Sequence, residues 1–161
     1  MHKRAAARRM PPPVVVAAPA FAAAGLPGGL AGAGTILVVE DDYALRELLR
    51  LTLEGYGYRV LVAAGGAEAL RIAEQQELPI SLLVSDVVMP AMAGPELARR
   101  LAARSSGLKV LLLSGYPRDA ALLGSQSAFL QKPFHPRALL AAVREILAAD
   151  AGQPTDRSRV G

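Results

Sequence analysis

Hydrophobic residues follow two alternating patterns between residues 35 and 149. Short continuous apolar runs, typical of strands buried on both faces, are separated by stretches in which apolar residues recur at helical spacing. The runs predict strands at 36–39, 59–62, 82–85, 109–113 and 128–131. Five strands that alternate with helices predict an α/β fold built on a doubly wound, five-stranded parallel sheet.

Each predicted strand is followed by a predicted helix, although the helices differ in strength. In the first helix, Leu45, Leu48 and Leu49 recur at helical spacing until Gly55 ends the pattern. The fourth helix, at about 118–124, is short and poorly patterned. Ala69, Leu70 and Ala73 mark the second helix, Leu97 and Leu101 lie in the third, and the last helix is expected at about 136–149.

The two ends of the chain lack these patterns. Residues 1–33 are rich in Ala, Pro, Gly and Val, and three consecutive prolines at 11–13 interrupt any long apolar helix. We expect a disordered leader or linker there, with a signal peptide or a membrane span as alternatives. We also expect residues 34–149 to form one domain and the polar residues 150–161 to be a disordered tail.

Composition and charge exclude several classes of function. The chain of 161 residues has no cysteine, so it forms neither a disulfide framework nor a thiolate metal site. Its net charge of +4 comes from the basic residues near the start, whereas acids and bases are equal in number over residues 11–149. The expected domain is therefore not a nucleic-acid binder by charge. The glycines at 29–34 resemble a dinucleotide-binding loop, but they precede a strand instead of following one.

Four of the five predicted strands end in polar side chains that suit phosphate or metal chemistry. Glu40 and Asp41 follow the first strand, Asp86 the third, Ser114 the fourth and Lys132 the fifth. Because the carboxyl ends of parallel strands meet at one edge of the sheet, we expect these side chains to converge. The second strand contributes none, as expected for a strand at the edge of the sheet.

These residue types restrict the chemistry. Three carboxylates brought together at neutral pH repel one another unless a cation lies among them. Hard oxygen ligands suit Mg²⁺, which binds one or two carboxylates directly and keeps several waters. A lysine and a hydroxyl suit an incoming phosphoryl group. The set therefore describes a carboxylate, Asp86, that accepts a phosphoryl group with the help of magnesium.

Over about residues 34–149 the sequence resembles the response-regulator receiver domain of two-component signalling. The matching motifs, in order, are VVEDD, SDVVMPAMAG, LLLSGY and FLQKPF, each at the end of a predicted strand. The resemblance implies a flavodoxin-like sheet with strand order 2-1-3-4-5. It also implies a cytoplasmic phosphorelay protein. Such a protein is not an enzyme, apart from catalysing its own phosphorylation and dephosphorylation.

The resemblance implies a role for each site residue. Asp86 would be the phosphoacceptor for a histidine kinase or a phosphotransfer protein. The Mg²⁺ ligands would be Asp41 and Asp86 directly, with the backbone carbonyl of Val88, and Glu40 acting through water.

On the phosphoryl side, Ser114 and Lys132 would contact the phosphoryl oxygens, with a cis bond between Lys132 and Pro133. Phe129 would be the aromatic switch that turns inward as Ser114 moves. We also expect a long-lived aspartyl phosphate, since Val88 cannot hydrogen-bond to a hydrolytic water and Tyr116 shields the site.

The partners implied are a kinase or phosphotransfer protein, without direct contact to nucleic acid or membrane. A homodimer or an output protein would use the face formed by the fourth helix, the fifth strand and the last helix, although the fourth helix is meagre. The chain fits a stand-alone receiver and the receiver tail of a hybrid kinase equally well.

Other functions fit the residues less well. A phosphohydrolase with an aspartyl nucleophile needs a second aspartate two residues after the first, where this chain has Val88. A flavodoxin-like cofactor site needs a loop that accepts phosphate, which Glu40, Asp41 and Asp42 would repel. A receiver fold that binds partners without phosphorylation is the remaining alternative. Asp42 is expected only to cap the first helix, and His135 to be a loop residue.

Overall fold

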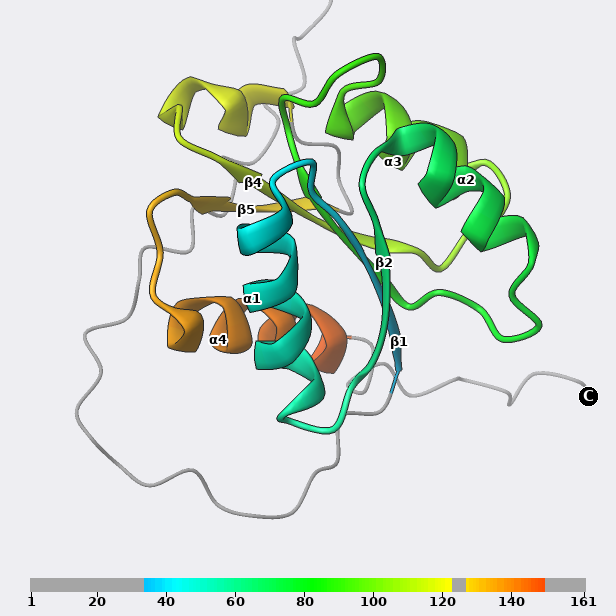
Figure 1. Ribbon diagram of the computed structural model, residues 1–161, viewed down its shortest axis with the longest axis horizontal. Coiled ribbons are helices and arrows are strands. Elements are labelled where there is room, and N and C mark those ends of the chain that lie inside the picture. The colour runs from blue at the N-terminus through cyan, green and yellow to red at the C-terminus, as the bar shows by residue number, and fades with distance from the viewer. Residues whose placement is uncertain (1–33, 123–126, 150–161) are drawn as a thin grey trace, which may run out of the picture.

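The computed structural model describes residues 34–122 and 127–149 (Figure 1). The predictions for the leader, the tail and the end of the fourth helix lie outside these ranges. The elements, in chain order, are β1 (Thr35–Val39), α1 (Tyr43–Glu54), β2 (Arg59–Ala63), α2 (Gly66–Glu74), β3 (Leu82–Asp86), α3 (Gly94–Ala102), β4 (Lys109–Ser114), the 3₁₀ helix η1 (Pro117–Leu122), β5 (Ser127–Gln131) and α4 (Pro136–Ala148).

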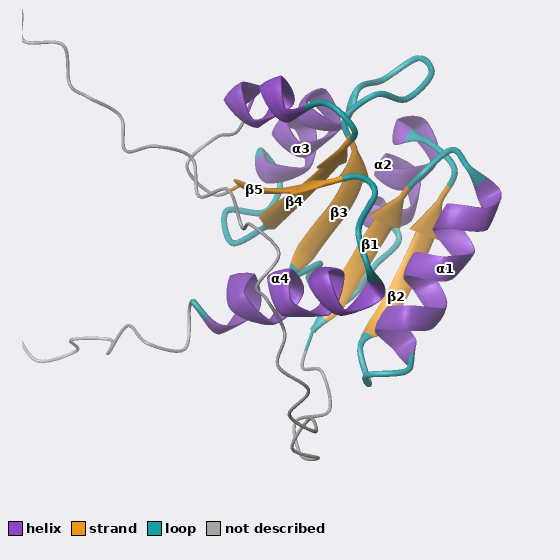
Figure 2. Ribbon diagram, turned by 90° about the vertical axis from the view of Figure 1, so that its left-hand side faces the viewer, coloured by secondary structure: helices purple, strands orange, loops and turns teal. Residues whose placement is uncertain are grey.

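The five strands form one parallel sheet in the order β2-β1-β3-β4-β5, which confirms the predicted fold class and strand order. Helices α1 and α4 cover one face of this sheet, and α2 and α3 cover the other (Figure 2). β2 lies at the edge, as the absence of a polar residue at its end suggested. The three-layer arrangement brings the carboxyl ends of β1, β3, β4 and β5 to one rim of the sheet.

Successive residues of each strand point to opposite layers, so each central strand contributes to two hydrophobic cores. In β1, Leu37 and Val39 pack on the side of α2 and α3, whereas Ile36 and Val38 pack on the side of α1 and α4. All four side chains are fully buried. The rim residues therefore stand on strands that are fixed on both faces.

Two local predictions differ from the structure. The segment expected as a short, poor helix at 118–124 forms η1, a 3₁₀ helix that begins at Pro117. In α1, Leu48 is 47% exposed and Leu53 is buried instead, because Leu49 and Leu53 lie one turn apart on the face that meets the sheet. Among the described residues, no helix has the length and hydropathy that a membrane span requires.

Candidate functional site

Three carboxylates meet at the rim, from two neighbouring strands. Glu40 and Asp41 follow β1 directly, and Asp86 is the last residue of β3. One carboxylate oxygen of each lies within 4.8 Å of the others. Glu40 is buried, with only 2% of its surface exposed, whereas Asp41 is exposed and Asp86 is partly buried. The predicted convergence of these acids is therefore present in the structure.

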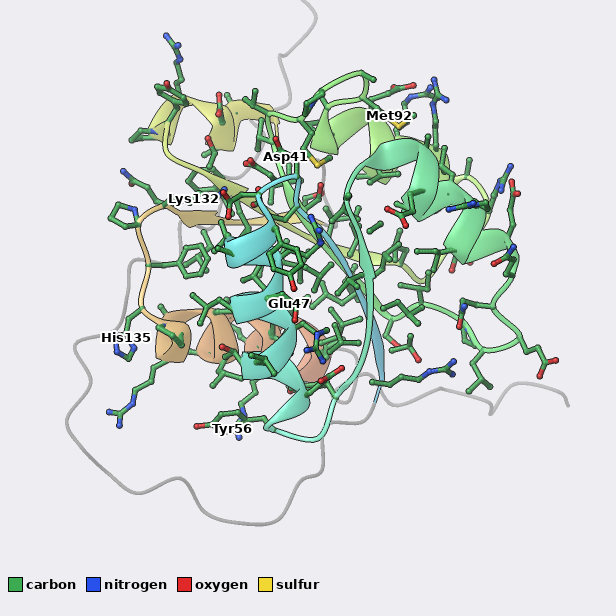
Figure 3. All side chains as sticks on the ribbon, viewed as in Figure 1. Asp41, Glu47, Tyr56, Met92, Lys132 and His135 are labelled. Carbon is green, nitrogen blue, oxygen red and sulfur yellow. The ribbon has the colours of Figure 1, made fainter. Side chains whose placement is uncertain are left out.

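Lys132 reaches this acidic cluster from β5. Its Nζ donates to Oε2 of Glu40 at 3.0 Å and lies 3.3 Å from Oδ2 of Asp86. The side chain thus links two acids that stand on different strands. Figure 3 shows Asp41 and Lys132 at the same end of the sheet, above the first turn of α1.

The charges of the cluster are not balanced. Burial raises the pKa of Glu40, and this effect outweighs the hydrogen bond from Lys132, which lowers it. Burial acts to lower the pKa of Lys132, but its hydrogen bond to Glu40 and the charges of Glu40 and Asp86 prevail, so this pKa is raised. Lys132 therefore stays charged at neutral pH, and one cation faces three carboxylates.

The loop that carries Glu40 and Asp41 is held by the first helix. Nη1 of Arg46 donates to the backbone oxygen of Glu40 at 2.6 Å. Asp42 is the N-cap of α1 and accepts a hydrogen bond from the backbone N–H of Leu45 at 2.8 Å, as predicted. The role of Arg46 was not predicted, since an arginine in a helix shows no sequence pattern that indicates a contact with a backbone carbonyl.

The loop after β3 places Asp86 by close backbone contacts. The N–H of Gly94 donates to the backbone oxygen of Val87 at 2.9 Å. A Cβ at Gly94 would lie only 2.2 Å from the backbone oxygen of Asp86, so this position requires glycine. Within the loop, Ala91 adopts a φ of 64°, which is rare for a residue with a side chain. Val88 is 65% exposed, two residues beyond Asp86.

Ser114 ends β4 at the same rim but is bonded to a different partner. It is 2% exposed, and its Oγ donates to Oδ2 of Asp119 at 2.5 Å. The same Oγ accepts from the backbone N–H of Tyr116 at 3.1 Å. Asp119 lies in η1 and was not singled out in the sequence, where only its distance of five residues from Ser114 could have suggested the contact.

Three other predicted residues occupy distinct environments. Phe129 is 2% exposed within the core on the side of α2 and α3, so a rotation of this ring stays a prediction. The bond between Lys132 and Pro133 is cis, as the resemblance implied. His135 lies away from Asp41 and Lys132 (Figure 3), where its Nδ1 accepts from the backbone N–H of Arg137 and caps α4.

The donor set fits a hard divalent cation. Three carboxylates within 4.8 Å supply oxygen ligands, the type that Mg²⁺ prefers, and the single lysine leaves negative charge in excess. One exposed acid, Asp41, leaves the cluster open to solvent. The cluster is therefore compatible with Mg²⁺ binding.

Comparison with known proteins connects this geometry to one family. The model of the response regulator receiver domain matches residues 36–144. The response regulator receiver protein CpdR of Brucella abortus (strain 2308) is 38% identical over 125 residues, which cover 71% of this chain and 97% of CpdR. The sensor kinase CckA of the same organism is 40% identical over 122 residues, but the match spans only 13% of that kinase.

Solved structures give the same result. The receiver domain of the hybrid histidine kinase CckA matches with a TM-score of 0.63 and 38% identity, covering 71% of this chain and 99% of that domain. The response regulator TrrA of Thermotoga maritima, solved in complex with Mg²⁺ and BeF, matches with a TM-score of 0.63 and 30% identity over 71% and 99% of the two chains.

Receiver domains are in general signalling modules, not enzymes, and they interact with histidine kinases or phosphotransfer proteins. The fold, the strand order and the family match agree with one another. The chain therefore belongs to the response regulator receiver domain family, and it serves as a phosphoacceptor in two-component signalling.

Proposed function

We propose that Asp86 is the residue that accepts the phosphoryl group. The observation that carries this proposal is the position of Lys132, whose Nζ lies 3.3 Å from Oδ2 of Asp86 where three carboxylates converge. A carboxylate at the end of a fixed central strand, with a cation beside it, is suited to act as a nucleophile toward phosphorus.

The transfer is a displacement at phosphorus. A carboxylate oxygen of Asp86 attacks the phosphorus of a phosphohistidine, and a P–O bond forms as the P–N bond breaks. The imidazole nitrogen leaves with the electron pair of that bond and takes up a proton. The ammonium of Lys132 stabilises the charge on the phosphoryl oxygens, and the hydroxyl of Ser114 donates a hydrogen bond to one of them.

We assign the Mg²⁺ site to the acidic cluster. Asp41 and Asp86 would hold the ion directly, together with the backbone carbonyl of Val88, and Glu40 would act through water. When bound, the ion neutralises carboxylate and phosphoryl oxygens that would otherwise repel one another. The exposure of Asp41 and the excess of negative charge support this assignment.

The catalytic activity of the chain is limited to reactions of its own aspartate. The chain catalyses only its own phosphorylation and the loss of that phosphate, since Val88 stands where a phosphohydrolase needs a second acid.

A histidine kinase or a phosphotransfer protein supplies the phosphoryl group in the cytoplasm. Phe129 and Ser114 pass the signal to the face formed by η1, β5 and α4, which binds a second copy or an output protein. The relatives include a receiver protein matched over 97% of its length and a sensor kinase matched over 13%, so the domain acts either alone or as the receiver of a kinase.

The test is phosphorylation of the full chain by acetyl phosphate, followed by intact-mass measurement with and without Mg²⁺. We expect the mass of one phosphoryl group to be added only when Mg²⁺ is present. Asp86→Asn should abolish the gain, because an amide oxygen is a much weaker nucleophile than a carboxylate.

Two adjacent aspartates provide a matched control for the metal site. Asp41→Asn should lose most of the Mg²⁺-dependent gain, whereas Asp42→Asn should retain it, since asparagine caps a helix as well as aspartate. A folded wild-type chain that gains no phosphoryl group would contradict the proposal and favour a partner-binding role. A phosphorylated Asp86→Asn variant would place the acceptor elsewhere.

A further inference from the structure

The hydroxyl of Ser114 is hydrogen-bonded to two partners, Asp119 and Tyr116. A serine hydroxyl has one proton to donate, and here that proton goes to Oδ2 of Asp119 at 2.5 Å. One of the oxygen's lone pairs accepts the N–H of Tyr116 at 3.1 Å. Ser114 therefore cannot donate to a phosphoryl oxygen unless it first leaves Asp119.

The bond to Asp119 belongs to the stronger class of hydrogen bonds. A hydroxyl that donates to a carboxylate forms a charge-assisted bond, which is shorter and roughly twice as strong as one between neutral groups. Ser114 is 2% exposed and Asp119 is partly exposed, so solvent screens this bond less than one at the surface. Within residues 34–122 and 127–149, no lysine or arginine forms an ion pair with Asp119.

Asp119 stands on η1, which is coupled to the core. Ala120, the next residue, is 8% exposed and belongs to the same hydrophobic cluster as Phe129 and Leu112. The backbone N–H of Asp119 donates to the oxygen of Tyr116 at 3.0 Å, so the turn after β4 and η1 form one bonded unit. A displacement of Asp119 therefore changes the packing around Phe129.

We infer that Asp119 is a positioning residue that holds Ser114 away from the phosphoryl site until Asp86 is phosphorylated. The inference rests on the proposed function of Asp86 and goes one step further. A phosphoryl group adds negative charge to the rim, competes for the single proton of Ser114 and repels the carboxylate of Asp119. Release of this hydrogen bond frees η1 and thereby connects phosphorylation to the face formed by η1, β5 and α4.

The test measures the affinity of the full chain for beryllofluoride in the presence of Mg²⁺, by isothermal titration. This probe is appropriate because a similar receiver, TrrA, was solved in complex with Mg²⁺ and BeF. Asp119→Ala should bind the probe about tenfold more tightly than the wild type, the amount expected when one hydrogen bond to a charged group no longer has to be broken. Asp119→Asn should lie between the two, since its amide oxygen still accepts from Ser114.

A double-mutant cycle separates this role from a general effect of charge or stability. In a Ser114→Ala background, Asp119→Ala should change the affinity by less than about twofold, because there is no hydroxyl left to hold. Glu77→Ala removes an exposed acid from the loop after α2 and should leave the affinity unchanged. Hydrogen exchange adds a structural measurement, in which beryllofluoride should speed exchange in 117–122 of the wild type, whereas Asp119→Ala should exchange fast without it.

The outcomes distinguish this inference from the proposed function. Failure of the wild type to bind beryllofluoride would contradict the function proposed for Asp86. Binding by the wild type with an equal or lower affinity in Asp119→Ala would overturn the role of Asp119 alone. The same tenfold gain in the Ser114→Ala background would also overturn it. If Asp119→Ala does not fold, Asp119→Asn carries the test, with an affinity no higher than wild type as the contradicting result.

Discussion

The rim of the sheet has two halves whose polar side chains are bonded in different ways. The acidic half consists of Glu40, Asp41, Asp86 and Lys132, where the lysine joins carboxylates from two strands. The hydroxyl half consists of Ser114 and Asp119, whose side chains bond to each other. The two halves are joined through the backbone, where the N–H of Lys132 donates to the oxygen of Ser114 at 2.7 Å. The lysine and carboxylates of the acidic half thus contact one another directly, whereas the hydroxyl of Ser114 is bonded to Asp119 instead.

The difference follows from the elements that carry each half. The acids stand at the ends of β1 and β3, which are central strands with helices on both faces, so their positions are fixed by two cores. Asp119 stands on a short 3₁₀ helix, whose weaker hydrogen-bond geometry makes it easier to rearrange. A rigid half suits binding of Mg²⁺ and phosphate, and a half that can change its bonds suits transmission of a signal.

Gly94→Ala should give the largest effect, because it breaks the support of the acidic half at the backbone. The new Cβ would lie 2.2 Å from the backbone oxygen of Asp86, and no flexible side chain can move to relieve this clash. We expect the free energy of unfolding to fall by about 3 kcal/mol, measured by urea denaturation. Gly107→Ala is the matched control, since nothing lies within 4 Å of its added Cβ. Equal stability of the two variants would show that the loop is not fixed as described.

Lys132→Met tests whether the lysine holds the acidic half together. The change leaves the buried carboxylate of Glu40 without its cation, next to Asp86 and Asp41. We expect a loss of about 2 kcal/mol at pH 7, below the full cost of breaking a buried pair because Lys132 is 24% exposed. Arg104→Met breaks an exposed pair with Glu74 and should cost less than about 0.5 kcal/mol. Similar losses of stability in both variants would show that Lys132 stabilises the fold no more than an exposed ion pair does.

Val88→Asn tests how the rim is shielded from hydrolytic water. Val88 and Tyr116 are 65% and 58% exposed, two residues beyond Asp86 and Ser114, and Val88 offers a water molecule no hydrogen bond. An asparagine amide could orient that water, so we expect the aspartyl phosphate to be lost about fivefold faster, equivalent to roughly 1 kcal/mol in the barrier. The decay is timed by intact mass after removal of acetyl phosphate, with Val88→Leu as the control. An unchanged lifetime in Val88→Asn would contradict the expectation.

Glu40→Gln should have the smallest effect. The effect is a change in how the unfolding free energy depends on pH, measured without Mg²⁺. Because the pKa of Glu40 is raised in the folded protein, its stabilising contribution is present at low pH and is lost as the pH rises through that raised pKa. At pH 4 the carboxyl is mostly protonated and resembles glutamine. The unfolding free energy of Glu40→Gln relative to the wild type should therefore increase from pH 4 to pH 7. Urea midpoints at the two pH values provide the measurement, and a decrease would contradict the direction of the shift.

The acidic half was predictable from sequence, and the hydroxyl half was predictable only in part. Apolar runs that end in a carboxylate, a serine or a lysine mark the strand ends, and parallel strands bring those ends together. The bond between Ser114 and Asp119 depends on the 3₁₀ geometry of η1, which a poor helical pattern does not reveal. The contact of Arg46 with the backbone of Glu40 depends on the rotation of α1, as does the exposure of Leu48.

Lys132 and Glu40 lie 92 residues apart in the chain, and their ion pair joins the first strand to the last. Such a contact forms only after the intervening strands are in register, since closing so long a loop gains nothing until the sheet between its ends exists. A nascent chain still lacking β5, or one trapped with a misaligned strand, has the aspartate but not the ammonium beside it. The site proposed for phosphoryl transfer is therefore complete only in a chain whose five strands are all paired.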